Sequence, residues 1–314
     1  MTTRLENIIH APLGWMLRGL ALLPFGALYA LSSATFAVLY HVARYRRRVV
    51  ADNLAKCFPH LTDSERSAIE RQFYRNLSDY FFETIKLLHV SDEEMRRRIV
   101  FENMEVLDSL FDHGKSVVAY FSHCFNWEWA PAITLWSRYS GRDDVRFCQV
   151  YRPLKNRWTD RFMLRLRSRF GSLSLPKRTV LRDLLRMRNE GILSVTGFMS
   201  DQKPSHGDPT LPLMFLRRPT AMITGTETLA RKLKTGVIYF DLSHISRGHY
   251  RLKLRPIAED ASLTAPMEIT RRYAELLQQS IDRDPADWLW THKRWKKPVE
   301  LPVEEISSHE QPAR

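Results

Sequence analysis

The feature that most constrains the fold is an alternation of short apolar runs with helical segments beyond residue 115. The apolar runs predict strands at 116–121, 145–151, 192–198, 237–242 and 250–254. The segments around them predict helices near 127–138, 157–169, 179–189, 220–234 and 265–282. Strands separated by helical stretches are typical of an α/β fold, so we expect a mixed, partly parallel sheet flanked by helices.

The region before this alternation predicts helices and a membrane-associated segment. Residues 49–115 carry apolar side chains at helical spacing, and we interpret all of this region as helical. Gly19–Tyr40 is an uncharged run of 22 residues, and about 20 apolar residues are enough to cross a bilayer. Two hypotheses fit this run: a spanning or embedded anchor, and a buried or interfacial helical hairpin. Either one predicts a hydrophobic N-terminal helix at a membrane.

The charges around this run predict its orientation and the division of the chain. Four arginines lie just after it, at 44 and 46–48, against two before it, at 4 and 18. Cytoplasmic flanks carry the excess of arginine and lysine, so the remainder of the chain should be cytoplasmic. We therefore divide the chain into an N-terminal membrane anchor (1–48), a main domain (49–298) and a flexible Pro- and Glu-rich tail (299–314).

A net charge of +13 predicts an anionic partner. Residues 152–188 hold twelve Lys and Arg against two Asp, and four of the arginines recur every fourth residue from 157 to 169. A solvated helix surface and a face for phosphate or membrane both fit this stripe. Nucleic acid is not expected, because no helix-turn-helix, finger or RNA-binding motif accompanies the charge. The three cysteines lack CxxC spacing, so neither a disulfide framework nor a zinc site is expected.

His123 and Glu128 are the candidate catalytic pair. An apolar run, Val117–Phe121, leads to His123, and Glu128 follows five residues later among aromatic side chains. Histidine is the natural general base near neutral pH, and a carboxylate can orient it and stabilise its charged form. On one helix, five positions would hold the two side chains about 140° apart. A pair therefore requires His123 in a turn after the strand and Glu128 on the next helix. A buried histidine beside a solvated glutamate fits the spacing equally well.

Two later segments complete the candidate site. Asp201 follows the third predicted strand, where α/β sites are usually assembled, although a turn-forming Asp is equally compatible. Residues 287–297 combine three tryptophans with cationic side chains. This stretch is either membrane-seeking or a C-terminal helix that packs its tryptophans on the core. The phosphate-loop, dinucleotide, serine-hydrolase and zincin motifs are absent from the sequence.

Taken together, these motifs resemble the bacterial lipid A biosynthesis acyltransferases, which have an H-x4-[D/E] motif. The motif is His123–Glu128, in the fuller form His-x-x-Asn-Trp-Glu that includes Asn126. The resemblance continues through 151–156, Arg167-Ser168-Arg169-Phe170-Gly171, Asp201-Gln202 and 290–296, and it covers about residues 12–298. Cys124 stands where family members often have glycine, and residues 203–206 are also unusual, which leaves the acceptor open.

The resemblance implies transfer of an acyl chain from an acyl carrier protein thioester to a hydroxyl of a lipid A precursor. His123 would remove the hydroxyl proton and Glu128 would orient the imidazole. No covalent acyl-enzyme is required, so Cys124 is only a minor alternative nucleophile. Substrate-binding roles would fall to Asn126, Arg152, Arg167, Arg169 and Asp201.

The resemblance also implies a site on the cytoplasmic side of the bacterial inner membrane, with no metal and no cofactor. One alternative is an acyltransferase that acts on a lysophospholipid or another membrane lipid, with acyl-CoA or acyl carrier protein as donor. An alternative of another class is a non-catalytic basic protein that binds membranes.

Overall fold

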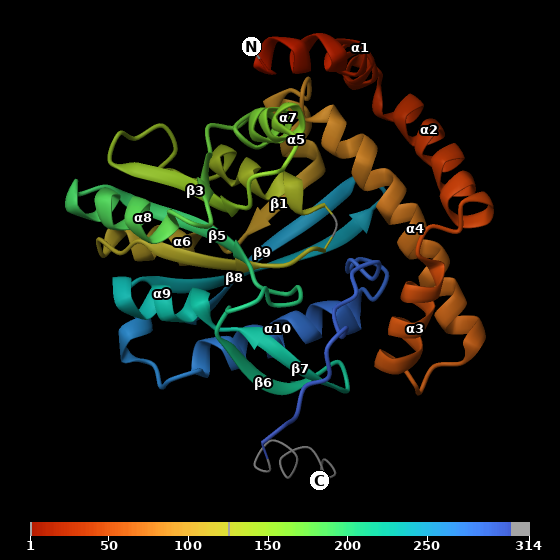
Figure 1. Cartoon of the computed structure of the whole chain (residues 1–314). Helices are drawn as coiled ribbons and strands as arrows, with labels where there is room; N and C mark the ends of the chain where they lie inside the picture. The colour runs from red at the N-terminus through yellow and green to blue at the C-terminus, as the bar shows by residue number, and fades with distance from the viewer. Residues whose placement is uncertain (1, 125, 303–314) are drawn as a thin grey trace.

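A sheet with helices on both faces forms the centre of the structure (Figure 1), a computed structural model that describes residues 2–124 and 126–302. In this described part, seven strands form one sheet in the order β1-β9-β8-β2-β5-β3-β4. All neighbouring strands are parallel except β8 and β9. The predicted α/β class with a mixed, partly parallel sheet flanked by helices is confirmed. The strands are β1 (Ile99–Glu102), β2 (Val117–Phe121), β3 (Val145–Tyr151), β4 (Leu173–Pro176), β5 (Leu193–Met199), β8 (Gly236–Ser246) and β9 (His249–Ala258).

The central strands are apolar along their whole length because both of their faces are covered. Val118 and Tyr120 of β2 belong to one hydrophobic cluster, and Val117 and Ala119 belong to another. This two-residue alternation is that of a strand buried on both sides. The first cluster includes side chains of α8 (Val180–Asn189), α9 (Gly225–Leu233) and α10 (Glu268–Arg283). The second includes side chains of α6 (Met104–Asp112), α7 (Arg157–Arg167) and a 3₁₀ helix, η2 (Trp127–Leu135).

Four sequence predictions about these elements are wrong. The region 49–115 contains β1 between α5 (Asp92–Arg98) and α6. The helix expected at 127–138 is the shorter 3₁₀ helix η2, which contains Pro131. The helix expected at 220–234 starts only at Gly225, because β6 (Thr210–Phe215) and β7 (Arg218–Ile223) form an antiparallel hairpin before it. The tryptophan-rich segment 287–297 contains no helix.

The N-terminal apolar run is not one helix. It is divided between α1 (Thr2–Leu22) and α2 (Phe25–Ala37), and α2 continues as a π-helical turn, Val38–Val42. Pro24 lies at the break, where its missing N–H and its ring prevent continuous helical hydrogen bonding. Lys86 satisfies two backbone carbonyl groups at this break: its Nζ donates to the oxygens of Ala21 (3.0 Å) and Leu23 (2.7 Å).

One helical window, Phe25–Val42, is long enough and apolar enough to cross a membrane by length and composition. It lies beside α4 (Asp63–Lys86), as Figure 1 shows. Its inner face bears hydrogen-bonding groups: the hydroxyl of Ser32 donates to Asp79 (2.6 Å) and that of Tyr29 to Glu83 (3.0 Å). The short α3 (Arg47–Cys57) connects this segment to α4. Most of the predicted flexible tail, residues 303–314, lies outside the described residues.

Candidate active site

The register of two neighbouring strands brings His123 and Asp201 together. β2 and β5 are parallel, and Phe121 pairs with Met199 at their carboxyl ends. His123 and Asp201 each follow two residues later, so both reach the same edge of the sheet. The imidazole Nδ1 of His123 lies 2.8 Å from Oδ1 of Asp201. The structure therefore places the predicted Asp201 in direct contact with the predicted histidine.

Three donors converge on Asp201, whose side chain is completely buried. Oδ2 accepts from the backbone N–H of His123 (3.0 Å) and from the indole Nε1 of Trp288 (2.8 Å), while Oδ1 faces the imidazole. Burial alone would raise the pKa of Asp201, but the charge of His123 and these hydrogen bonds outweigh burial and lower it to about 2. An ionised Asp201 holds the imidazole proton on Nδ1 and leaves the lone pair on Nε2.

Glu128 has a different partner from the one predicted. Arg167 donates two hydrogen bonds to the Glu128 carboxylate, from Nε (2.8 Å) and from Nη2 (2.6 Å). The indole of Trp127 donates a third (3.1 Å). Among the described residues no hydrogen bond joins His123 to Glu128, and Nδ1 of the imidazole faces Asp201 instead. His123 does lie in the turn after β2 and Glu128 on the next helix, as the spacing required. The carboxylate in contact with the imidazole, however, is that of Asp201.

His123, Glu128 and Arg167 line one cavity of about 700 Å³. Most of the cavity wall is apolar, and part of its rim is charged. Apolar side chains line the interior at Ala130, Ile133, Phe147, Val195 and Phe240. Arg152, Lys177 and Asp208 are the charged lining residues at the ends of strands and in loops. Pockets of this size with a few polar groups are typical of sites for organic ligands.

The five residues predicted to bind substrate have different positions. Arg152 and Arg167 line the cavity with His123. Asn126 is fully buried beneath the site, where its Oδ1 accepts from the backbone N–H of Glu128 (3.2 Å). Arg169 donates to the backbone oxygen of Val90 and to Asp92 of α5, both at 3.0 Å. It lies beyond the end of α7 at Arg167, so it does not continue the helical face of the preceding arginines. Asn126, Arg169 and the completely buried Asp201 do not line the cavity.

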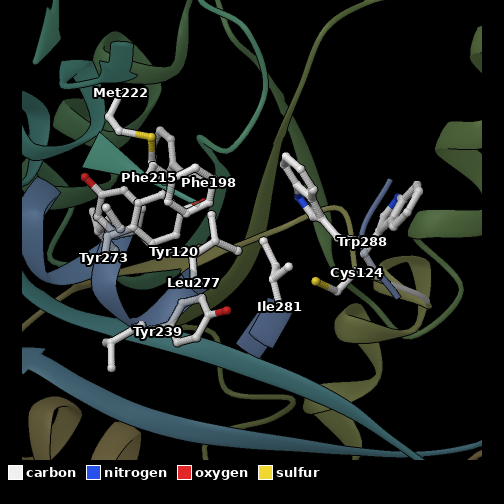
Figure 2. Packing of buried hydrophobic residues seen from close by; sticks show 14 of the residues in the cluster. Tyr120, Cys124, Phe198, Phe215, Met222, Tyr239, Tyr273, Leu277, Ile281 and Trp288 are labelled. Carbon is white, nitrogen blue, oxygen red and sulfur yellow. The ribbon is translucent and has the colours of Figure 1, made fainter. Parts of the chain in front are cut away.

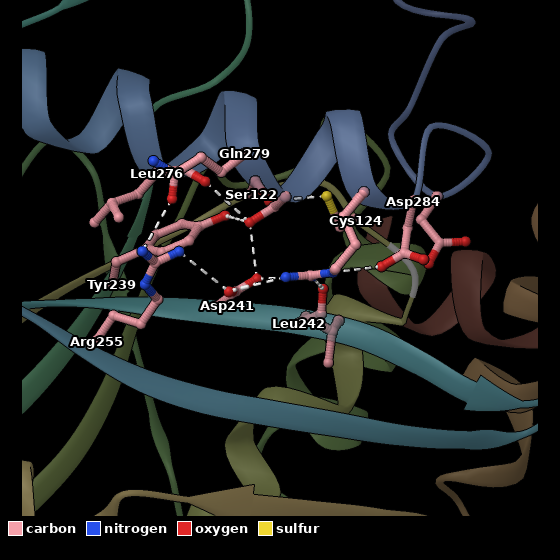
Figure 3. A network of polar contacts seen from close by, with 12 residues as sticks. Ser122, Cys124, Tyr239, Asp241, Leu242, Arg255, Leu276, Gln279 and Asp284 are labelled. Carbon is pink, nitrogen blue, oxygen red and sulfur yellow. Dashed lines mark hydrogen bonds and ion pairs between the residues drawn. The ribbon is translucent and has the colours of Figure 1, made fainter.

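Cys124 is buried next to the histidine, and it has the properties of a core residue rather than a nucleophile. Figure 2 shows it packed close to Ile281 and Trp288, and Figure 3 shows its contact with Ser122. The Ser122 hydroxyl donates to its sulfur at 3.1 Å. Burial raises the pKa of the Cys124 thiol well above its ordinary value, so the thiol stays protonated. Within residues 2–124 and 126–302, no group of three His, Cys, Asp or Glu side chains is arranged to hold a metal ion.

Sequence reasoning missed two side chains of this site. Trp288 donates to Asp201 from a segment 87 residues later, and no local pattern indicates that contact. The interpretation that the tryptophans pack on the core is confirmed, since Trp288 is 2% exposed and Trp290 fully buried. Tyr80 of α4 also lines the cavity, with its ring 4.3 Å from that of Trp127. Tyr80 stands beside Phe81 and Phe82 in the segment predicted to be helical, and such aromatic clusters indicate packing rather than a functional site.

Comparisons with known proteins identify the family of this chain. A sequence profile for bacterial lipid A biosynthesis acyltransferases matches residues 9–297. The lipid A biosynthesis palmitoleoyltransferase of Escherichia coli (strain K12) is 23% identical over 285 residues, which cover 88% of each chain. The lipid A biosynthesis acyltransferase of Shigella flexneri has the same identity and coverage. The profile spans nearly the whole chain, including both strand ends of the site, and the protein therefore belongs to the bacterial lipid A biosynthesis acyltransferase family.

Proposed function

We propose that this acyltransferase moves a fatty acyl chain from an acyl carrier protein thioester to a hydroxyl of a lipid A precursor. The observation that carries the proposal is the His123–Asp201 pair, whose histidine lines a largely apolar cavity with Arg152 and the Lys177–Asp208 ion pair at its rim. The pair supplies a general base, the apolar wall suits an acyl chain, and Arg152 suits a phosphorylated acceptor. The acyltransferase class and the lipid A acceptor follow from the family; the donor, the hydroxyl and the residue roles are the proposal.

In this reaction His123 transfers one proton twice. Its Nε2 takes the proton of the acceptor hydroxyl while the hydroxyl oxygen attacks the thioester carbonyl carbon. The tetrahedral intermediate collapses, the carbon–sulfur bond breaks, and the imidazolium returns the proton to the departing sulfur. The products are an ester and a free thiol. General-base catalysis of this kind contributes about 10²–10⁴-fold, and Asp201 stabilises the imidazolium that forms between the two steps.

Arg167 is the group best placed to stabilise negative charge on the intermediate. Two of its N–H groups bind Glu128, and three of the roughly five that a guanidinium carries remain. Glu128, which is 3% exposed, fixes the orientation of the guanidinium at the cavity wall. A donor held in place before the reaction stabilises an oxyanion without further reorganisation. Glu128 and Arg167 thus act as a unit in the proposed mechanism.

The outer surface of the N-terminal helices supports a site at the inner membrane. Trp15 (72% exposed) and Leu22 (68%) lie in α1, Leu31 (40%) in α2 and Val42 (77%) in the π-helical turn, so each of these consecutive elements exposes an apolar side chain. Exposed apolar side chains on successive helices mark a membrane contact. The arginines that follow at 44 and 46–48 support a catalytic domain on the cytoplasmic side.

Lipid mass spectrometry and a purified assay test the proposal together. A strain that lacks the gene should lose one acyl chain from lipid A, and the plasmid-borne gene should restore it. The purified protein should then transfer the chain from acyl carrier protein to the deacylated precursor, and His123→Ala should not. An unchanged lipid A in the deletion strain refutes the acceptor. Transfer only to a lysophospholipid, or only from acyl-CoA, identifies the alternative enzyme, and full activity of His123→Ala refutes the mechanism.

A further inference from the structure

The loop that carries His123 and Glu128 is attached to a buried carboxylate on α4. Glu83 lies near the end of that helix and is 1% exposed. Its Oε2 accepts from the side-chain amide of Asn126 at 2.9 Å and from the hydroxyl of Tyr250 at 2.7 Å. No Lys or Arg among the described residues forms an ion pair with Glu83, so its partners are neutral donors. This carboxylate has no place in the acyl-transfer steps above.

Asn126 transmits the position of Glu83 to Glu128. While its amide nitrogen donates to Glu83, its Oδ1 accepts from the backbone N–H of Glu128 (3.2 Å) and so caps η2. Its backbone oxygen accepts from the N–H of Trp129 (3.1 Å), whose indole donates to the backbone oxygen of Glu83 (3.4 Å). Glu83 of α4 is therefore joined to the start of η2 by two hydrogen bonds, one through Asn126 and one through Trp129.

The other oxygen of Glu83 is held by the N-terminal segment. Tyr29 of α2 donates to Oε1 at 3.0 Å. Gly248, in the turn between β8 and β9, makes room for this hydroxyl: a Cβ on Gly248 would lie 1.7 Å from it. Arg247 packs over the Tyr29 ring at 4.6 Å and donates to Asp79, which also binds Ser32 of α2. Several independent contacts thus seat α2 on the residues around Glu83.

We propose, on the basis of the function proposed above, that Glu83 is a positioning residue through which the seating of α2 fixes the catalytic loop. Tyr29 and Asn126 hold opposite oxygens of one carboxylate, so displacement of α2 loosens the support of the cap on Glu128. Burial, together with the neighbouring charge of Asp79, raises the pKa of Glu83. An unfavourably buried acid of this kind depends on its three donors, and the loss of one donor affects the others. The membrane-facing helix is in this way part of the support of the active site.

Turnover and hydrogen–deuterium exchange of three variants test this proposal. In Glu83→Ala the loop loses its acceptor, and we expect kcat to fall at least tenfold with KM within twofold. Exchange in residues 122–130 should rise at least tenfold. Glu83→Gln should recover kcat to within about threefold, because its amide oxygen still accepts from Asn126 and the hydroxyl of Tyr29 can accept from its amide nitrogen. Tyr29→Phe should raise exchange in 122–130 although the substitution is in α2.

Glu70→Ala is the matched control on the same helix. Glu70 is also buried and bonded, to Arg47 at 2.7 Å, but it makes no contact with the catalytic loop. If Glu83→Ala and Glu70→Ala change kcat and exchange in 122–130 equally, the positioning role is refuted. If Glu83→Ala does not fold, Tyr29→Phe decides, and unchanged exchange in 122–130 refutes the link. A wild-type protein without acyl transfer would refute the proposed function alone, since exchange is measured without substrate.

Discussion

Replacement of Asp201 by asparagine should abolish the base while the fold persists. An asparagine keeps the shape of the side chain but presents one acceptor and one donor. At the Oδ2 position two donors converge, the backbone N–H of His123 and the indole of Trp288, whereas only the imidazole faces Oδ1. An amide nitrogen at Oδ2 would leave two buried donors unsatisfied, at about 1–3 kcal/mol each. The amide oxygen therefore occupies that position and the nitrogen faces His123.

The consequence is the wrong tautomer of His123. Its Nδ1 must accept from the amide, so the proton moves to Nε2, which then has no lone pair for the acceptor hydroxyl. We expect kcat of Asp201→Asn to fall about 10²–10⁴-fold, the contribution of a general base, while the protein stays folded and loses no more than the roughly 2 kcal/mol that the ionised carboxylate contributes. Steady-state release of thiol from acyl carrier protein measures the effect. An Asp201→Asn enzyme within tenfold of wild-type kcat would refute the tautomer argument.

Two further variants sharpen this test. Asp287→Asn makes the same change in a second His–Asp pair, where Oδ2 lies 2.7 Å from Nδ1 of His244 and outside the lining of the catalytic cavity. Its kcat should stay within about threefold of wild type. Trp288→Phe removes one of the two donors at Oδ2, so the two amide orientations become closer in energy. The double variant Trp288→Phe/Asp201→Asn should therefore lose less activity than the product of the two single losses.

Four other outcomes follow from the site. Cys124→Ala should keep kcat within about threefold, because a buried protonated thiol takes no part in transfer; turnover measures this, and an inactive but folded variant would restore the nucleophile hypothesis. Arg152→Ala should raise KM for a phosphorylated acceptor and Arg169→Ala should not, since only Arg152 lines the cavity; equal effects in the same kinetic assay would contradict this geometry. Arg167→Lys should lower the free energy of unfolding by about 1–3 kcal/mol, because lysine cannot form the two-pronged contact with a buried carboxylate; urea denaturation measures it. Folding lowers the pKa of Asp201 from 3.8 to about 2, so the ionised carboxylate should contribute about 2 kcal/mol to the stability of the wild type above pH 4. This contribution should disappear as the pH falls toward 2. Denaturation curves of Asp201→Asn should show no such decrease in stability between about pH 4 and pH 2.

The strands of the central sheet could be predicted because they are apolar on both faces. β3 spans the predicted residues 145–151, and β2 and β5 differ from their predicted bounds by one residue. The β6–β7 hairpin gave no such signal. Its turn places Leu216 and Arg217 at positive φ (49° and 59°), where asparagine or glycine usually stands. β1 has only four residues between two helices, too few to show a period.

The sequence indicated the residues of the candidate site but not which carboxylate contacts the histidine. His123 at a strand end and Asp201 at another were both recognisable, because each follows an apolar run. Their contact requires that β2 and β5 are neighbours in the sheet and that Phe121 pairs with Met199. Neither can be predicted from the spacing of nearby residues. Proximity in sequence favoured Glu128 as the partner of the histidine. The carboxylate that contacts the imidazole in the structure is instead that of Asp201, 78 residues away.

The break at Pro24 has a consequence for how the protein is made. Lys86 satisfies the carbonyl oxygens of Ala21 and Leu23, and it lies 65 residues beyond the first of them. At synthesis rates of about 5–20 residues per second, Ala21 is made roughly 3–13 s before Lys86. During that interval the apolar helices have no protein surface to cover them, so a bilayer or a targeting factor is the available partner. The ribosome therefore presents this apolar N-terminal segment before the rest of the chain can fold around it.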